Sequence, residues 1–214
     1  MTAQSFVESY FEAAYAAYKK YGIHPTATIA QAAKESGWGE AYNATKAKNF
    51  FGMTKGSAII NEYWFGIWRK SASGQKYRVY PSATNSFLDF GRVIATHYPD
   101  SAAVSSDLEQ YADTISQSAY LTSADNRAQY RSDLISIGNK CSHYVECMIA
   151  KKETPAETLS LPVINKATGD SCPLNREADD ASGKEINALT ILLWVFVLVV
   201  VPGGLAFYFL KNNK

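Results

Sequence analysis

Glu35 is the residue whose sequence surroundings best suit chemistry. It follows the small residues Ala32 and Ala33, and two glycines, Gly37 and Gly39, come directly after it around a tryptophan. The glycines permit the positive-φ turn that ends a helix, so Glu35 is expected in a last turn, where the helix dipole disfavours ionisation. A carboxyl group in that position, beside an indole, is biased towards donating a proton. The alternative is an ordinary solvent-facing glutamate before a glycine cap.

A second carboxylate, Glu62, lies in a segment of different pattern. Residues 57–80 are rich in β-branched and aromatic side chains around the turn signal Ser71-Ala72-Ser73-Gly74. This pattern predicts a β-hairpin with Glu62 near the beginning of its first strand. Two carboxyl groups can cleave a glycosidic bond, one by donating a proton and the other by activating water or attacking the sugar. A solvated strand residue is the alternative interpretation of Glu62.

Composition excludes several other classes of site. The formal net charge is +1, and no basic cluster with interleaved aromatics is visible in the sequence, so we expect no nucleic-acid partner. Cys141, Cys147 and Cys172, with only His143 among them, fit no zinc-binding spacing, so we expect no metal; they allow one disulfide whose pairing the spacing does not decide. The many tyrosines and phenylalanines suit a carbohydrate-binding cleft as well as a core.

The elements around Glu35 are expected to be mainly helical. Helical periodicity covers the first twenty residues, then Pro25 to Glu35, then Thr84 to His97. A capping box at Ser106 and Glu109 opens another helix, and a last helix runs from Tyr130 to Val145; residues 43–48 have the composition of a loop.

The chain changes character after residue 150. Residues 1–150 are expected to form the folded domain, and residues 151–187, with prolines and small polar side chains, a linker. Residues 188–210 contain no charged residue and are long enough to cross a hydrocarbon layer of roughly 30 Å, so a C-terminal transmembrane helix is predicted there, followed by the short polar tail 211–214. The first ten residues lack the pattern of a secretory signal.

The ordered motifs resemble the peptidoglycan glucosaminidase family, glycoside hydrolase family seventy-three, which includes flagellar peptidoglycan hydrolases and is related in fold to lysozyme. The resemblance covers roughly residues 5–148. It is carried by Tyr21-Gly22-Ile23-His24-Pro25, Ala30-Gln31-Ala32-Ala33-Lys34-Glu35-Ser36-Gly37-Trp38-Gly39, Asn49-Phe50-Phe51-Gly52, Glu62-Tyr63, Tyr77-Arg78-Val79-Tyr80-Pro81-Ser82 and Ser86-Phe87-Leu88-Asp89-Phe90. The expected fold class is α+β, mostly α: a lysozyme-like helical domain with a small β-hairpin lobe, then the linker and the transmembrane helix.

The resemblance implies roles for individual residues. Glu35 matches the catalytic general acid, Glu62 a second carboxylate of some members, and Tyr120 a tyrosine near the cleft. After Tyr120, the usual Ala-Thr-Asp is replaced by Leu121-Thr122-Ser123. The expected substrate-binding residues come from the same motifs: Trp38, Asn49, Phe51 and Tyr63.

The implied activity is that of an endo-β-N-acetylglucosaminidase, which cuts the β-1,4 bond after N-acetylglucosamine in peptidoglycan without a metal or organic cofactor. A muramidase, a lytic transglycosylase and a non-catalytic glycan-binding scaffold module are the alternatives. The partner of Glu35 is either Glu62 activating water, with inversion, or the substrate's own 2-acetamido oxygen, with retention.

The expected partners are peptidoglycan strands and a lipid membrane. The anchor leaves two locations open for the domain. One is a bacterial envelope, with the domain facing the periplasm, and the other is the virion membrane of a phage that carries a lytic enzyme for wall penetration.

Overall fold

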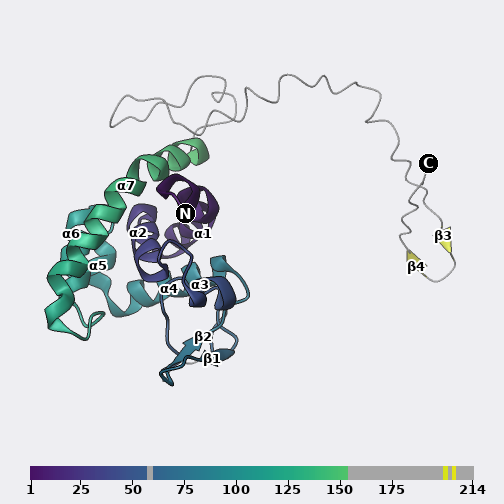
Figure 1. The fold of residues 1–214 in the computed structure, drawn as a ribbon. Coiled ribbons are helices and arrows are strands. Elements are labelled where there is room, and N and C mark those ends of the chain that lie inside the picture. The colour runs from purple at the N-terminus through teal and green to yellow at the C-terminus, as the bar shows by residue number, and fades with distance from the viewer. Residues whose placement is uncertain (57–59, 154–199, 202–203, 206–214) are drawn as a thin grey trace. The chain divides into compact units, whose positions relative to one another are not determined.

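The structure is a computed structural model that describes residues 1–56, 60–153, 200–201 and 204–205. These fall into two units, one within Met1–Leu174 and one within Asn175–Lys214. The first unit is mostly helical (Figure 1). Its elements are α1 (Ala3–Tyr21), α2 (Pro25–Ser36), α3 (Tyr42–Ala47), β1 (Trp68–Lys70), β2 (Lys76–Arg78), α4 (Ala83–His97), α5 (Pro99–Ala103), α6 (Leu108–Gln117), the 3-10 helix η1 (Ala124–Asn126) and α7 (Arg127–Glu153).

Helix α2 is the centre of this unit. Ten of its twelve residues are buried, and it contacts α1, α6 and α7. Because half of its residues are alanine or threonine, the neighbouring helices can approach it closely. The small-residue pattern before Glu35 therefore produces a helix enclosed by others, as Figure 1 shows for its place between α1 and α7.

A cluster of phenylalanines joins α4 to the motif that follows α3. The rings of Phe51 and Phe90 are stacked with centroids 3.9 Å apart, and Phe87 lies edge-on to Phe51 at 4.9 Å. Phe50 packs between Phe87 and Tyr10 of α1. Full burial of one such side chain contributes about 1.5–3 kcal/mol, so this cluster fixes residues 49–52 against α1 and α4.

The predicted β-hairpin is present, and it is shorter than expected. β1 and β2 pair antiparallel, with Trp68 opposite Arg78 and Lys70 opposite Lys76. The prediction that Glu62 lies in the first strand is wrong, since Glu62 belongs to the loop before β1. Asn61 explains the difference: its Oδ1 accepts the backbone N–H groups of Tyr63 and Trp64 at 2.8 and 3.0 Å, which folds these residues into a turn.

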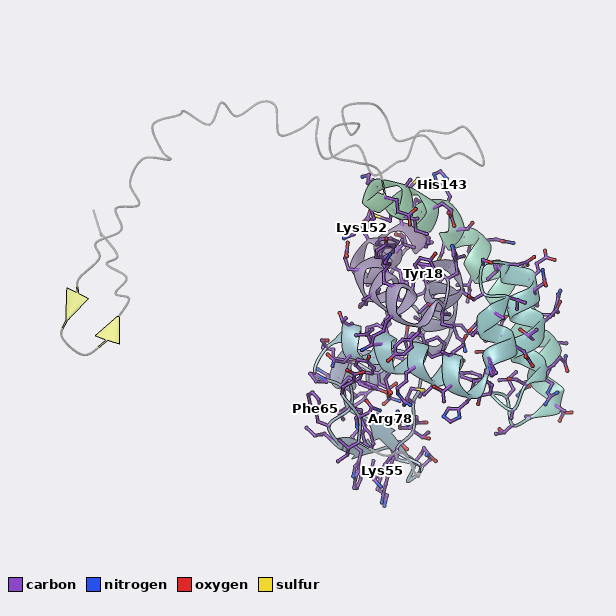
Figure 2. The ribbon with its side chains drawn as sticks, turned by 180° about the vertical axis from the view of Figure 1, so that it is seen from behind. Tyr18, Lys55, Phe65, Arg78, His143 and Lys152 are labelled. Atoms are coloured by element: carbon purple, nitrogen blue, oxygen red, sulfur yellow. The ribbon has the colours of Figure 1, made fainter. Side chains whose placement is uncertain are left out.

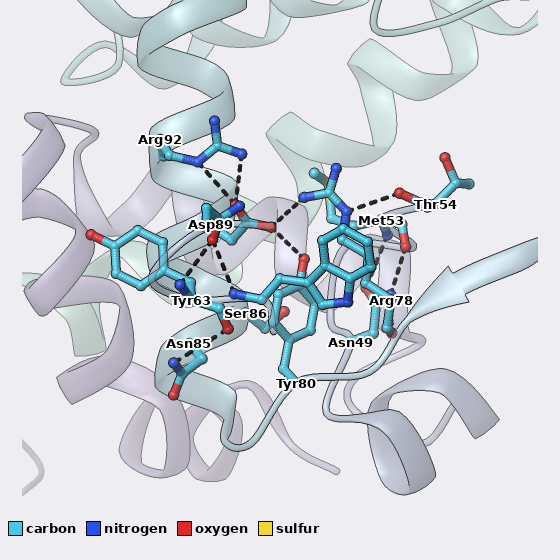
Figure 3. Close-up of polar contacts among 12 residues, drawn as sticks. Asn49, Met53, Thr54, Tyr63, Arg78, Tyr80, Asn85, Ser86, Asp89 and Arg92 are labelled. Carbon is cyan, nitrogen blue, oxygen red and sulfur yellow. Dashed lines mark hydrogen bonds and ion pairs between the residues drawn. The ribbon is translucent and has the colours of Figure 1, made fainter. Parts of the chain in front are cut away.

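Asp89 of α4 ties the hairpin lobe to the helices (Figure 3). Its carboxylate is fully buried and forms ion pairs with Arg78 of β2 and with Arg92, one turn further along α4. The Tyr80 hydroxyl donates to the same group at 2.7 Å, and the Asn61 amide does so at 3.0 Å. Four side chains from the lobe and from α4 therefore converge on one carboxylate.

Two local expectations are corrected. Residues 43–48 were expected to form a loop, yet most of them belong to the short helix α3. Helix α6 is capped by Asp107 rather than Ser106, because the Asp107 carboxylate accepts the N–H groups of Glu109 and Gln110, each at 3.0 Å.

Most of the predicted linker 151–187 and of the predicted membrane helix 188–210 lies outside the described residues. Within the part of the chain that the structure describes, no helix is both long and apolar enough to span a membrane. The described residues of the second unit form a short antiparallel pair, β3 (Val200–Val201) with β4 (Gly204–Leu205). At these four residues the helix prediction is wrong, because the intervening Pro-Gly sequence favours a turn over a continuous helix.

Candidate active site

Glu35 occupies the last turn of α2, as predicted. Gly37 ends the helix in the left-handed region, with φ of 54°, and its N–H points to the carbonyl groups of Ala33 and Lys34. The Trp38 N–H also donates to the Ala33 carbonyl, at 2.8 Å. The carboxyl group of Glu35 is thus carried on a helix whose end is fixed by backbone hydrogen bonds.

The turn after the helix has three successive positive φ values, 54° at Gly37, 58° at Trp38 and 79° at Gly39. The Ser36 hydroxyl accepts the N–H of Gly39 at 2.8 Å and closes this turn. The Trp38 ring lies edge-on to Phe6 of α1, with centroids 5.6 Å apart. The turn therefore directs Trp38 towards the N-terminal part of α1, where it stays half-buried.

The Glu35 carboxyl has a neutral hydrogen-bond donor as its direct partner. Its Oε1 accepts from the Tyr130 hydroxyl of α7 at 2.7 Å. Burial raises the pKa of Glu35, and the Tyr130 hydrogen bond and the charge of Lys34 offset part of that rise. Lys34 itself pairs with Asp133 at 2.6 Å. A raised pKa keeps a larger share of Glu35 protonated, as a proton donor requires.

Three tyrosines surround this carboxyl group. Burial, and secondarily the charge of Glu35, raises the pKa of Tyr111 and that of Tyr120. The ring of Tyr120 lies 6.3 Å from that of Tyr130, which is the hydrogen-bond partner of Glu35. The Tyr111 hydroxyl donates to Oε1 of Gln31, which is fully buried one helical turn before Glu35.

Sequence analysis did not single out Gln31, Tyr111 or Tyr130 for the site. Gln31 carried a usable signal, because residues four apart lie on the same face of a helix. Tyr130 is separated from Glu35 by 95 residues, so only the packing of α7 on α2 reveals their contact.

Among the described residues, no hydrogen bond or ion pair joins Glu62 to Glu35. Glu62 is exposed and pairs with Lys20, at the C-terminal end of α1, at 3.0 Å. The turn beside Glu35 packs instead on Phe6, and the fourteen residues from Phe6 to Lys20 correspond to about 21 Å along a helix. Hydrogen bonds from Tyr63 and Lys20 lower the pKa of Glu62, which suits an ionised surface group.

Three predicted substrate-binding residues are buried in supporting positions. Asn49 is 1% exposed, and its side chain bonds to the backbone of Met53 and Arg78. Phe51 belongs to the phenylalanine cluster, and the Tyr63 hydroxyl bonds with that of Tyr21 at 2.6 Å. These side chains shape the hairpin lobe from inside rather than face solvent.

An open cavity of about 370 Å³ adjoins the tyrosines and does not include Glu35 in its lining. It is bordered by the end of α4, by α5 and by α6, with Tyr98 in its wall. The Tyr98 ring contacts that of Tyr120 at 5.6 Å. Among the described residues, no group of histidine, cysteine and acidic side chains could hold a metal ion; Cys141 is a buried free thiol and Cys147 is disulfide-bonded.

Two solved structures resemble this fold. The glycoside hydrolase domain of Salmonella typhimurium FlgJ aligns over 75% of this chain and 100% of that domain, with 23% identity and a TM-score of 0.53. A peptidoglycan hydrolase from Sphingomonas sp. A1 aligns over 65% of this chain and 93% of its own, with 21% identity and a TM-score of 0.50. These likenesses support the predicted α+β, mostly helical class.

Two curated relatives match shorter stretches. The exo-glucosaminidase LytG of Bacillus subtilis is 46% identical over 50 residues, which are 23% of this chain and 18% of that protein. A probable N-acetylmuramidase of Lactococcus lactis is 31% identical over 102 residues, 44% of this chain and 23% of that protein. The chain thus spans about a fifth of the length of these relatives.

The glucosaminidase family, described as mannosyl-glycoprotein endo-β-N-acetylglucosaminidase, matches residues 11–143. This range is more than half of the chain and contains Glu35, Tyr120 and Tyr130. The family predicted from the ordered motifs is therefore confirmed: the chain belongs to the glucosaminidase family.

Proposed function

We propose that this protein is a peptidoglycan hydrolase that cleaves the β-1,4 bond after N-acetylglucosamine, with Glu35 as the proton donor. The proposal rests on the Glu35 carboxyl group. It is half-buried, its pKa is raised, and its Oε1 accepts a hydrogen bond from the Tyr130 hydroxyl. Among the described residues, no hydrogen bond reaches Oε2, so that oxygen can present a proton to a glycosidic oxygen.

The separation of the two glutamates supports the substrate's own acetamido group as the nucleophile. Carboxyl groups that act as a pair in glycosidases lie about 5–9.5 Å apart, whereas Glu62 and the Glu35 turn contact opposite ends of α1. Glu35 protonates the leaving oxygen and the C1–O bond breaks. The acetamido oxygen then bonds to C1, and water opens this ring while the Glu35 carboxylate takes its proton, which retains the β-anomer. Tyr120, beside Glu35, orients the acetamido group.

Mass spectrometry of digested peptidoglycan tests the proposed bond. We expect products with reducing-end N-acetylglucosamine from the full chain and none from Glu35→Gln. Reducing-end muramic acid would instead identify a muramidase, the second candidate, which the N-acetylmuramidase among the relatives favours. Anhydro-muramic acid would identify a lytic transglycosylase, and the absence of any product a glycan-binding module.

The proposal extends to a membrane tether. Residues 188–210 carry no charge, and residues 151–187 would let the domain reach glycan from a membrane surface. The domain then faces the periplasm or is carried in the membrane of a phage particle; we favour the particle. Fractionation at alkaline pH should leave the full chain in the membrane and release a chain ending at residue 187. Protease protection on spheroplasts, with fractionation of released particles, separates the two locations.

A further inference from the structure

The basic residues of this nearly neutral chain are concentrated in one segment. Residues 41–81 contain seven lysine or arginine residues and one glutamate, a formal charge of +6. Because the whole chain is +1, the other 173 residues carry −5. These cations are spread over 41 positions, so the sequence does not show them as a cluster. The hairpin lobe brings three of the lysines together.

Three of these lysines and one tryptophan lie together on the hairpin. Lys70 and Lys76 are opposite each other in the β1–β2 pair, and the Lys76 Nζ lies 4.5 Å from the centroid of the Trp68 ring. The Lys55 backbone N–H donates to the Lys76 carbonyl at 2.7 Å, which adds a third lysine. We call Lys55, Trp68, Lys70 and Lys76 the basic hairpin face. Figure 2 shows Lys55 and Phe65 on the outside of the lobe.

The basic hairpin face contains features that do not stabilise the fold. Like charges directly opposite in a β-ladder are destabilising, and neither Lys70 nor Lys76 forms an ion pair with another described residue. Trp68 is 40% exposed. An exposed tryptophan bordered by cations that form no ion pair with another described residue is typical of a binding surface.

The combination of groups indicates the kind of partner. Ammonium groups pair with carboxylates, and the face of an exposed tryptophan can stack on a sugar ring. An anionic glycan offers both groups on one polymer. A long polyanion that contacts the whole domain is a less suitable partner, because the residues outside 41–81 carry a net negative charge.

We propose that the basic hairpin face binds the acidic groups of a glycan strand and holds the domain on its polymer. This inference rests on the proposed function and adds a second contact with the substrate to it: a surface that prefers glycan with free carboxylates to uncharged chitin. The lysines supply the preference for charge, and Trp68 supplies affinity for any chain of pyranose rings.

Sedimentation with insoluble polymers tests the proposal, using the full chain with Glu35→Gln so that cleavage does not interfere. We compare Lys70→Ala/Lys76→Ala with Lys19→Ala/Lys140→Ala, which removes two exposed helix lysines and changes the net charge equally. The hairpin pair should bind phosphate-free peptidoglycan about fivefold more weakly at low salt, and the difference should shrink at high salt. The helix pair should bind as the parent does. Trp68→Ala should weaken binding to both peptidoglycan and chitin.

The hairpin double variant should melt at the same temperature as its parent or slightly higher, because it removes a repulsion, so its weaker binding is not a folding defect. Equal binding of the hairpin and helix variants to peptidoglycan would overturn the proposal. The proposal would also be overturned if the hairpin variant lost binding to anionic lipid vesicles or duplex DNA while it kept its binding to peptidoglycan. That result would assign the face to a membrane or a nucleic acid. Absence of any cleavage product from the parent chain would refute the proposed function alone and leave this binding comparison valid.

Discussion

Two carboxylates of the folded unit, Asp89 and Glu35, have opposite surroundings. Asp89 is fully buried and accepts hydrogen bonds from Arg78, Arg92 and two neutral side chains. Glu35 is half-buried and has one hydrogen-bond donor, the Tyr130 phenol. Both belong to helices, and both lie beside aromatic rings.

The difference separates a structural carboxylate from the one that we propose as the proton donor. Asp89 has its acceptor sites occupied by groups that hold the hairpin lobe, so nothing remains for a ligand. Glu35 receives a neutral donor instead of a guanidinium, and burial raises its pKa although the Tyr130 hydrogen bond and the charge of Lys34 offset part of the rise. Burial alone does not identify a catalytic acid; the charge of its partners does.

The strongest test of this comparison is to remove the reactive carboxyl. Glu35→Gln keeps the shape of the side chain and eliminates the proton, so cleavage of purified cell walls should fall about 10²- to 10⁴-fold. Turbidity clearing at equal protein concentration measures the loss. Clearing at the parent rate would show that the proton comes from another group.

Removing the structural carboxylate should act on stability instead. Asp89→Asn leaves the Arg78 guanidinium buried without its counter-ion, which should lower the free energy of unfolding by about 3–5 kcal/mol. Urea denaturation followed by circular dichroism gives this value. A variant as stable as the parent would mean that Asp89 does not hold the lobe.

Changing the partner of Glu35 should shift its titration. The Tyr130 hydroxyl stabilises the ionised carboxylate, so Tyr130→Phe should raise the pKa of Glu35 further. A general acid works below its pKa, and the decline of kcat/KM at high pH should therefore move to higher pH. Tyr98→Phe is the matched control, since the Tyr98 ring borders the same cluster without a hydrogen bond to Glu35. An identical pH profile for both variants would contradict the role of this bond.

The smallest effect is expected at the exposed glutamate. Glu62→Gln removes the negative charge that Lys20 and Tyr63 contact at the surface, so it should change stability little and reduce activity far less than Glu35→Gln. NMR of the first-formed anomer should show the β-configuration. A loss as large as that of Glu35→Gln, with an inverted product, would restore Glu62 as the base.

The parts of the site that were predictable from sequence are local. The position of Glu35 follows from small residues before it and glycines after it, and both act within one helix turn. The hairpin was also predictable, although its extent was not. Asn61 competes for the backbone N–H groups that a longer strand would have used, and its geometry is fixed by Asp89, 28 residues away.

The rest of the site depends on contacts between distant segments. The resemblance assigned Asn49 and Tyr63 to the substrate, and in the structure both side chains are buried. It offered Glu62 or the substrate's acetamido group as the partner of Glu35, and the contacts of Glu62 and of the Glu35 turn with opposite ends of α1 bear on that choice. The partner of Glu35 is on α7, which no local pattern connects to α2.

The backbone at Trp38 has a consequence for how substitutions rank. A bulky residue with φ of 58° is unfavourable by roughly 1–2 kcal/mol, and the contact with Phe6 offsets that strain. Alanine would lose the contact and keep the strain, whereas glycine would lose the contact and relieve it. Trp38→Gly should therefore unfold at a higher urea concentration than Trp38→Ala. This is the reverse of their usual order, and it marks a position where the smallest side chain is the better replacement for the largest.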